Sequence, residues 1–527
     1  MPIQRRTFLS HAAAVAVAIG VPPAWAASTG VLRRSRGGTL TTLDPHRLGS
    51  SLDAEIAAEL FVALTTTDAA GKLVAGCAKS WQRSQAGLTW TFQLRDDCAW
   101  SDGTPLRAAD FLFSARRFMS PASAATLAFR FDAIRNGSAV RAGKLAPDQL
   151  GVSAPDLRTV RFDLAQPDTD LPALLAALYP VPRHLLDKHG RDWAKPELIA
   201  TNGAYQVRSW AQSGTIDLTA NPYFWQASKV TVPRVQWISG IDDATRMRLY
   251  LNDQLDLAQI SDGTALKLAK QQRPAQLRTS PAWGAGWLGL NCRRGKLAEA
   301  DVRRALTLAI DRETLVLKVR QLDEQPWQSI VPAAVGEYGA PVLPAHASWP
   351  RARSLAAARE LLAKHGVGPR QRLKLQALYS ANPLTQRMFL AVGAMLRPLG
   401  IDVELIGLET RAYSIRLRAG DYDIQDYVPF ATIQTIGTFV SRFASDSFLN
   451  FMFYRNAEVD RLIALAERQL DATTRIARYR EVETILLRDC PVIPLYSATV
   501  HRLVAPQLRG WRDHEALTTP SRFLALA

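Results

Sequence analysis

The segment Thr201–Trp225 constrains the fold of this chain more than any other stretch does. Asn202-Gly203 is typical of a tight turn, and residues 204–210 after it alternate between apolar and polar side chains as β-strands do. A polar break then leads into a second short strand over residues 215–220, which Asn221-Pro222 ends. Aromatic residues complete the segment. The sequence therefore predicts a β-hairpin whose far end carries large apolar rings.

This segment resembles the Asn-Gly-Ala-Tyr…Trp…Asn-Pro-x-Tyr-Trp signature of the dipeptide- and oligopeptide-binding proteins of ABC importers, solute-binding protein family 5. Ser80–Arg117 is similar to a second block of that family, although Cys98 and Trp100 stand where related chains carry other residues. It contains a predicted strand at Trp90–Leu94 and a predicted helix at Asp110–Met119. The resemblance extends over most of residues 39–510.

The resemblance implies an α/β fold: a two-lobe periplasmic binding protein of type II, peptide-binding-like, with an extra β-rich subdomain in lobe one. It places the hairpin in the lobe that begins and ends the chain, beside the ligand cleft. We expect lobe one over residues 27–278, with the subdomain at about 66–155. Lobe two is expected over residues 279–489, and residues 490–527 are expected to return to lobe one.

Lobe two contains a pattern that indicates a parallel sheet. A predicted strand at Leu373–Leu378, a helix at Leu384–Arg397 and a strand at Asp402–Leu405 have the size of a parallel βαβ unit. Ser354 is predicted to cap a helix that begins at Leu355. The apolar strand Val492–Tyr496 is expected to carry the chain back into lobe one.

The first 26 residues have the composition of an export signal. Arg5-Arg6 lie in a twin-arginine motif, the apolar run 12–21 follows, and Ala24-Trp25-Ala26 matches the pattern before a signal-peptide cleavage site. The run is too short to span a membrane, and no cysteine near its end could carry a lipid anchor. We therefore predict a Tat signal peptide at 1–26 and a periplasmic protein that is not a lipoprotein. An N-terminal helix of a cytosolic protein is the alternative.

The chain carries a formal net charge of +16 at pH 7, which can indicate nucleic-acid binding. Its arginines are scattered without a block or repeat, and an exported protein meets no nucleic acid as a routine partner. We expect a solvated basic surface with some attraction for anionic lipid or acidic ligands. The four cysteines lack the C-x-x-C spacing of zinc or redox sites. Cys77 and Cys98 could form a disulfide, although four cysteines allow three connectivities.

Sequence motifs of catalysis are absent. No G-x-S-x-G, S-x-x-K, H-E-x-x-H or P-loop pattern occurs, and the eight histidines are dispersed. Gly284–Gly289 matches G-x-G-x-x-G in its letters, but Pro281 precedes it and residues 287–291 alternate like a strand, so the strand–turn–helix context of dinucleotide binding is missing. We predict a binding protein without cofactor, metal or enzymatic activity. An exported hydrolase on a two-lobe scaffold is the alternative from another class.

The segment Gly420–Tyr454 contains a loop that, by the resemblance, faces the ligand. Peptide-binding members carry a Gly-Trp-x-x-Asp pattern here, and its aspartate receives the α-ammonium of the peptide. Counted from Asp423, that aspartate falls on Thr432. A buried ammonium without a carboxylate is costly. Either Asp426 supplies the charge from a shifted position, or the ligand has no free α-amino group. Asp426 could also be an ordinary surface or turn carboxylate.

By the resemblance, cleft residues come from both lobes. They are Ser50, Ser51, Asn202, Trp283, Asp426, Tyr427, Phe430 and Thr432. For each of them, packing in the core or a loop is the alternative. The implied function is capture of a peptide or a similar small organic solute by a monomer, which delivers it to the permease subunits of an ABC importer. A non-peptide solute, a metal chelate and an exported sensor subunit stay open as alternatives.

Overall fold

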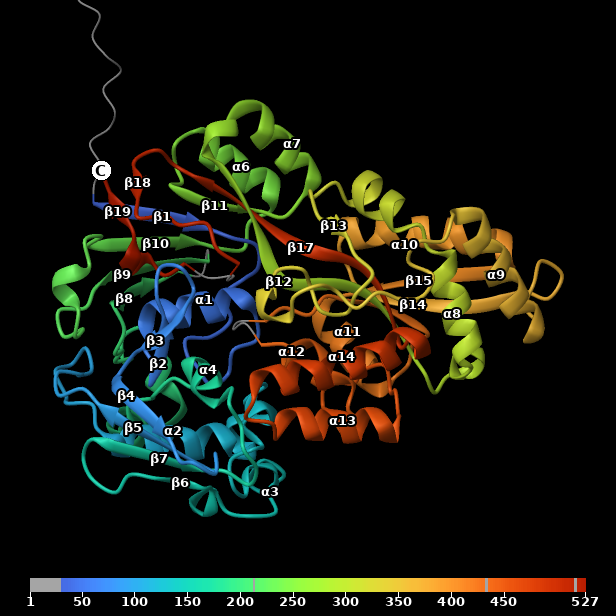
Figure 1. Ribbon diagram of the computed structural model, residues 1–527. Helices are drawn as coiled ribbons and strands as arrows, with labels where there is room; N and C mark the ends of the chain where they lie inside the picture. Colours follow the sequence, from blue (N-terminus) through green and yellow to red (C-terminus); the bar gives the residue numbers. More distant parts are fainter. Residues whose placement is uncertain (1–29, 212–213, 432–434, 516–518) are drawn as a thin grey trace, which may run out of the picture.

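The computed structural model describes residues 30–211, 214–431, 435–515 and 519–527, so the predicted signal peptide and Thr432 lie outside the described residues. One mixed sheet runs through most of the molecule in the order β15-β14-β16-β12-β17-β11-β1-β10-β9-β8, with β13 paired to β17 (Figure 1). Its strands are β1 (Val31–Ser35), β8 (Tyr205–Trp210), β9 (Thr215–Ala220), β10 (Arg234–Ile238), β11 (Leu257–Ile260), β12 (Leu277–Leu290), β13 (Gln325–Pro326), β14 (Leu373–Ser380), β15 (Ile401–Leu408), β16 (Ile424–Tyr427) and β17 (Val492–Val504).

At one end of this sheet, β1 pairs in parallel with β10 and β11, while β9 pairs antiparallel with β10 and β8. The helices of this end are α1 (Ser51–Leu60), α6 (Asp243–Leu251) and α7 (Gly263–Gln272). The predicted hairpin is confirmed as β8 and β9. Tyr205, Ile216 and Leu218 are buried in the hydrophobic core of this end of the sheet. Because β8 pairs only with β9 among the described strands, the hairpin forms the outer edge of the sheet.

A second, four-stranded antiparallel sheet, in the order β4-β5-β7-β6, lies beside this end. Its strands are β4 (Ala78–Arg83), β5 (Thr89–Leu94), β6 (Val152–Ser153) and β7 (Thr159–Asp163), and the ribbon of β2 (Thr65–Thr67) and β3 (Leu73–Ala75) precedes them. The helices are α2 (Ala108–Met119), α3 (Gly137–Arg141), α4 (Leu171–Leu174) and α5 (Arg183–His189). The predicted strand at 90–94 is therefore confirmed. The helix predicted from Asp110 begins earlier, because the Asp110 carboxylate accepts the Arg107 N–H and closes the first turn.

At the other end of the large sheet, β14 pairs in parallel with β15, which confirms the predicted βαβ unit. The helices here are α8 (Ala300–Ala309), α9 (Arg351–Lys364), α10 (Pro383–Leu396), α11 (Thr410–Ala419), α12 (Gly437–Val440), α13 (Ala457–Glu467) and α14 (Ala472–Asp489). The predicted cap at Ser354 is wrong: α9 begins at Arg351, and Ser354 is buried inside it. Pro350 stands immediately before the helix, where its fixed φ suits the entry into the first turn.

The strands β12 and β17 pair antiparallel from Leu277–Leu503 to Gly289–Val492 and connect the two ends of the sheet. The Gly284–Gly289 pattern lies inside β12, so the prediction that it is a strand is confirmed. A Cβ on Gly286 would stand 2.0 Å from the Tyr496 ring. The glycine therefore serves close packing between the two crossing strands.

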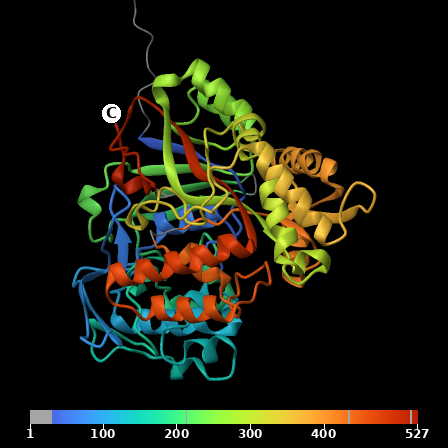
Figure 2. The same ribbon diagram turned by 45° about the vertical axis from the view of Figure 1, so that its right-hand side comes forward.

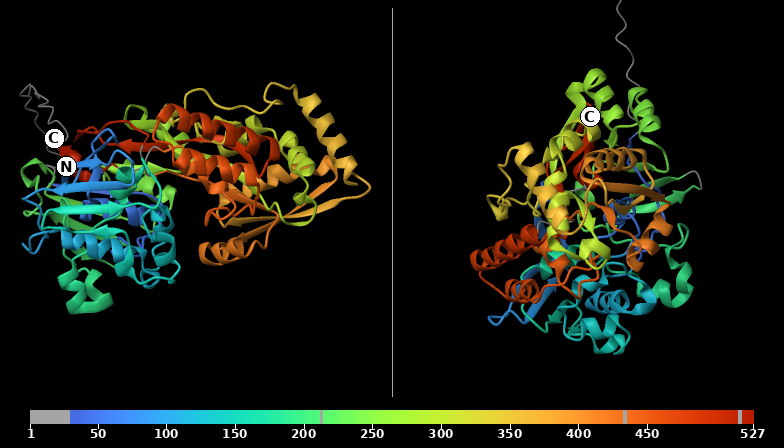
Figure 3. Two further views of the ribbon diagram at one scale, coloured as in Figure 1. Left: turned by 60° about the horizontal axis from the view of Figure 1, so that its bottom comes forward. Right: turned by 90° about the vertical axis from the view of Figure 1, so that its right-hand side faces the viewer.

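We use the name lobe one for the end built on β1–β11 and the name lobe two for the end built on β13–β16 and α8–α14. Figure 3 shows the orange part of lobe two, which carries β14 and β15, projecting away from lobe one. In Figure 2, the red helices α13 and α14 lie beside the cyan part of lobe one. All four cysteines have free thiols. Among the helices of the described ranges, none combines the length and apolar character needed to cross a membrane.

Candidate functional site

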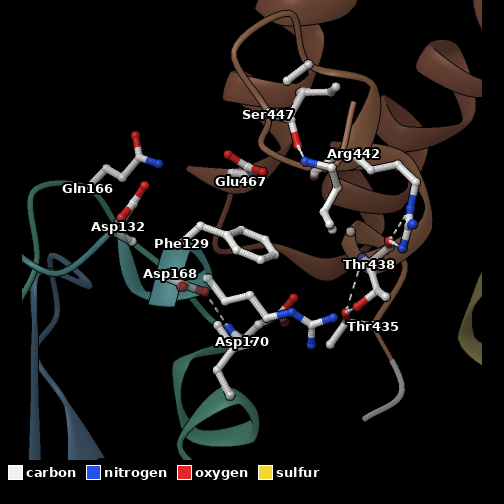
Figure 4. A pocket seen from close by; sticks show the side chains of 18 of the residues that line it. Phe129, Asp132, Gln166, Asp168, Asp170, Thr435, Thr438, Arg442, Ser447 and Glu467 are labelled. Carbon is white, nitrogen blue, oxygen red and sulfur yellow. Dashed lines mark hydrogen bonds between the residues drawn. The ribbon is translucent and has the colours of Figure 1, made fainter. Parts of the chain in front are cut away.

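A cavity of about 570 Å³ lies between lobe one and lobe two, where residues 129–174 face residues 435–479 (Figure 4). Lobe one contributes the short helical turn at Ala128–Phe131 and the segment that leads into α4. Lobe two contributes α12, the segment 444–449 that follows it, the C-terminal half of α13 and the N-terminal half of α14. Because the two walls belong to different lobes, a relative movement of the lobes would change the volume of the cavity.

Side-chain contacts join the two lobes around this cavity. They are Phe129 with Phe448 (ring centroids 5.6 Å apart), Arg468 Nε with Gln166 Oε1 (3.2 Å) and Arg475 Nη1 with Thr169 Oγ1 (2.7 Å). The lobes are therefore closed on each other in this structure. Polar contacts of this kind contribute little net stability each, so the closed arrangement can open at small cost.

Arg442 stands on the lobe-two wall of the cavity and is 5% exposed. Its Nε donates to the carbonyl oxygen of Thr438 at 2.9 Å, and its Nη1 donates to the hydroxyl of Tyr427. The guanidinium carbon lies 5.7 Å from the centre of the Trp287 ring. These contacts fix the side chain in one orientation. No carboxylate of the described residues forms an ion pair with it.

Arg130 stands on the lobe-one wall of the same cavity. Within the described ranges its side chain makes no hydrogen bond and no ion pair. Burial, and then the positive charge of Arg442, lowers the pKa of Arg130 to about 10. Two guanidinium groups from opposite lobes are thus close enough to repel each other in a partly dehydrated space.

Acidic side chains line the same cavity. Asp168 and Asp170 belong to lobe one, and Glu467 belongs to lobe two. Burial, and then the negative charge of Asp170, raises the pKa of Asp168 to about 7, and Glu467 adds to the effect. Burial also raises the pKa of Asp170, and the positive charge of Arg475 partly offsets this increase. Carboxyl groups from opposite lobes therefore influence each other in this cavity as well.

The lobe-one residues that the sequence predicts for the cleft stand outside this cavity lining. Ser50 is the N-cap of α1: its Oγ accepts the Asp53 N–H at 3.1 Å, and the Asp53 carboxylate accepts the Ser50 N–H at 3.0 Å. Ser51 Oγ accepts a hydrogen bond from Arg36 at 2.9 Å. Asn202 is buried, and its side-chain amide bonds both the N–H and the carbonyl oxygen of Val62. Contact of these side chains with a ligand stays a prediction.

The predicted aromatic residues Trp283, Tyr427 and Phe430 lie near β12, one of the two strands that connect the lobes. Trp283 is 5% exposed, and its indole N–H finds no hydrogen-bond partner among the described residues. Phe430 is 39% exposed, and its ring fills the space that a side chain on Gly284 would need. Tyr427 reaches the cavity indirectly, because its hydroxyl holds Arg442 in place. None of the three is itself part of the cavity lining.

Asp426 lies in β16, opposite Leu288 of β12, and is also outside the cavity lining. Its Oδ2 accepts a hydrogen bond from Thr385 at 3.2 Å. Burial raises the pKa of Asp426, while the nearby positive charge of Arg320 lowers it. Arg320 is already bonded to both carboxylate oxygens of Glu324. A role for Asp426 toward a ligand ammonium stays a prediction.

The charged residues of the cavity were not found by sequence reasoning. Arg130 belongs to the segment Ala122–Arg158, which resembles the family only loosely, and Arg442 is one of many scattered arginines. No motif distinguishes either of them from the solvated arginines elsewhere. Only the fold brings them together.

Comparisons with known proteins show what the whole chain is similar to. The sequence model of the bacterial extracellular solute-binding proteins, family 5 Middle, matches residues 72–447. The probable deoxycholate-binding periplasmic protein YgiS of Escherichia coli (strain K12) is 30% identical, over 90% of this chain and 89% of that protein. Haemophilus influenzae OppA in complex with the peptide RPPGFSPFR is similar with a TM-score of 0.85 and 27% identity, over 95% of this chain and 99% of that one.

The murein tripeptide binding protein MppA of Escherichia coli gives two structural comparisons. One structure has a TM-score of 0.87 and 28% identity, over 94% of this chain and 98% of that one. Its unliganded open form has a TM-score of 0.75 at the same identity, over 95% and 98%. The lower score for the open form agrees with the contacts that close the two lobes here.

Proposed function

Because this chain belongs to the bacterial extracellular solute-binding proteins of family 5, we propose that it captures a peptide or a similar small organic solute between its lobes and delivers it to an ABC importer. The observation that carries the proposal is the cavity walled by both lobes. Its volume of about 570 Å³ lies within the usual range for pockets that enclose small molecules. Opening and closing about β12 and β17 would load and release the solute.

Two classes of solute are supported by the relatives. OppA and MppA are named for peptides, and YgiS is named for deoxycholate. A non-peptide organic solute is favoured as the second candidate by one observation. Thr432 stands where peptide-binding members hold the ammonium with an aspartate, and Asp426 lies outside the cavity lining. Such a site has less to offer a free α-ammonium than those relatives have.

The remaining parts of the proposal concern location and partners. The protein acts as a monomer in the periplasm after export by the twin-arginine pathway, and its partners are permease subunits in the inner membrane. The names of its periplasmic relatives support the location, and the Arg5-Arg6 motif supports the route. It binds its solute without chemical change.

Mass spectrometry of small molecules that co-purify with the mature protein tests this function. We expect an organic solute that is released on unfolding and rebinds to the refolded protein with a measurable heat. Calorimetry with deoxycholate and a set of short peptides extends the test to the two named classes. Failure to find any co-purified solute, together with no heat from either class, would overturn the proposed function.

A further inference from the structure

Arg130 and Arg442 stand on opposite walls of the cavity, and no described carboxylate pairs with either of them. We infer that the two arginines bind an anionic group of the solute, a carboxylate, and that this negative charge makes closure of the lobes favourable. The inference deepens the proposed function and rests on it. It assigns both a ligand chemistry and a trigger for closure to two named side chains.

The geometry of Arg442 suits this role. Thr438 and Tyr427 hold its guanidinium in place, and two of its five N–H groups have no partner among the described residues. A planar guanidinium with free N–H groups matches a carboxylate, which can accept two parallel hydrogen bonds. Because the side chain is already fixed, little conformational entropy would be lost on binding.

Arg130 supplies the opposing charge from lobe one. Its side chain makes no hydrogen bond within the described residues, so the side chain does little to hold the fold together and its charge is available to a ligand. The rings of Phe129 and Phe448 close the cavity beside it and reduce contact with water. A charge in such surroundings interacts more strongly than it would in bulk solvent.

The two arginines also explain why closure would depend on the solute. In an empty protein, closing the lobes brings two positive charges toward each other at a cost that solvent cannot fully screen. A carboxylate between them changes this repulsion into two attractions. Five acidic residues line the same cavity, and none of them forms an ion pair with either arginine, so they do not replace the missing anion: Asp132, which pairs with Arg141, and Asp168, Asp170, Asp446 and Glu467.

Matched pairs of probes test the ligand chemistry. One pair is deoxycholate and its uncharged methyl ester, and the other is N-acetyl-trialanine with a free carboxylate and with a carboxamide. We expect the wild type to bind the carboxylate member of a pair at least about tenfold more tightly, the usual scale of one charged hydrogen-bonded contact. In Arg130→Gln the preference should fall below about threefold. Arg135→Gln, which removes an exposed arginine of lobe one, serves as the control and should keep the full preference.

A second measurement does not depend on knowing the solute. Small-angle scattering of ligand-free, refolded protein should give a smaller mean radius of gyration for Arg130→Gln than for wild type, because the repulsion that opposes closure is lost. Arg461→Gln, which removes an exposed arginine of lobe two, should match the wild type. Equal binding of the carboxylate and neutral probes by wild type would overturn the inference.

If no probe binds, an unchanged radius in Arg130→Gln would overturn it on its own. Loss of the proposed function would look different, since no solute would co-purify and no probe would bind to any variant. A smaller ligand-free radius in Arg130→Gln would still support the arginine pair in that case.

Discussion

Asp168 is a carboxylate whose charge in the closed protein depends on pH near neutrality. Burial, and then Asp170, raises its pKa to about 7, with a further contribution from Glu467. In an open protein the group would be solvated and would titrate near its ordinary value, so the closed form binds the proton more tightly. Protonation of Asp168 therefore favours closure in full only below the ordinary pKa of the open form, and this advantage is lost as the pH rises from there through about 7, the pKa in the closed form.

We expect the affinity for N-acetyl-trialanine, which has no cationic group, to be up to about tenfold weaker at about pH 8 than at about pH 6. The Asp168→Asn variant should show a much flatter dependence, as measured by calorimetry across this range. Asp187→Asn, a change at a largely exposed carboxylate, is the control and should follow the wild type. Parallel curves for wild type and Asp168→Asn would contradict the prediction.

Thr432 and Asp426 lead to a prediction about the amino end of a peptide ligand. A threonine hydroxyl can accept a hydrogen bond but cannot neutralise a buried ammonium, and the Asp426 carboxylate is engaged with Thr385 outside the cavity lining. We expect N-acetylated peptides to bind better than the same peptides with a free amine, in calorimetric titrations of wild type. If free-amine peptides bind tightly and Asp426→Asn abolishes that binding, Asp426 has taken the ammonium role and the prediction is wrong.

Among single residues, the sequence was informative where a role depends on the family pattern and silent where it depends on the fold. Tyr427 could be singled out because it lies in a segment with a recognisable pattern. Arg130 and Arg442 could not, because each is an ordinary arginine in the sequence, and only the tertiary structure places it in a cavity without an ion pair to any described carboxylate. A charge without a partner is a property of three-dimensional neighbours.

At the scale of elements, the N-terminus of α1 gives Ser50 a structural role as a helix cap, while the family resemblance predicts that Ser50 contacts the ligand. Its Oγ and the Asp53 carboxylate form a reciprocal capping box at the start of the helix. We expect Ser50→Ala to lower the free energy of unfolding by about 1 kcal/mol, the usual cost of losing an N-cap, while Ser50→Thr retains most of the stability. Denaturant unfolding of the ligand-free protein measures this effect.

The affinity of the same variants for the solute tests whether Ser50 contacts the ligand. If Ser50 touches the solute, Ser50→Ala should weaken binding at a temperature where the protein stays folded. Unchanged affinity with reduced stability would assign Ser50 to capping alone.

Local patterns predicted the elements better than they predicted where those elements stand. The hairpin β8–β9 and the β14–α10–β15 unit follow from alternation and helical periodicity within short windows. The cap at Ser354 was predicted wrongly, because the preceding Pro350 starts the helix one turn earlier. The position of the hairpin at the outer edge of the sheet depends on strand order, which short windows do not contain.

For the whole molecule, export is predicted to depend on the arginine pair near the start of the chain. The double substitution Arg5→Lys with Arg6→Lys keeps the positive charge but removes the pattern that the twin-arginine pathway reads. We expect the precursor to accumulate in the cytoplasm, as seen by fractionation and immunoblotting. Normal processing and periplasmic recovery of the double variant would refute the assignment.

The closed arrangement of the lobes is the feature on which the proposed function depends most. The contacts that join the lobes around the cavity are few, and the two strands β12 and β17 continue from one lobe into the other. The lobes can therefore separate by bending at these strands while the core of each lobe stays intact. We expect the radius of gyration to fall when a solute that binds is added to the ligand-free protein, with no change in the far-ultraviolet circular dichroism.

The variant Phe448→Ala tests the same motion from the rim of the cavity. Phe448 is 45% exposed and packs on Phe129 of the other lobe, so its loss should weaken closure more than it weakens folding. We expect several-fold weaker solute binding with a change in unfolding free energy below about 1 kcal/mol, the scale of one aromatic pair. Leu465→Ala, at an exposed leucine of α13 on the same lobe, should leave both the affinity and the compaction unchanged. A radius that stays constant at saturating solute in the wild type would show that the lobes do not move on binding.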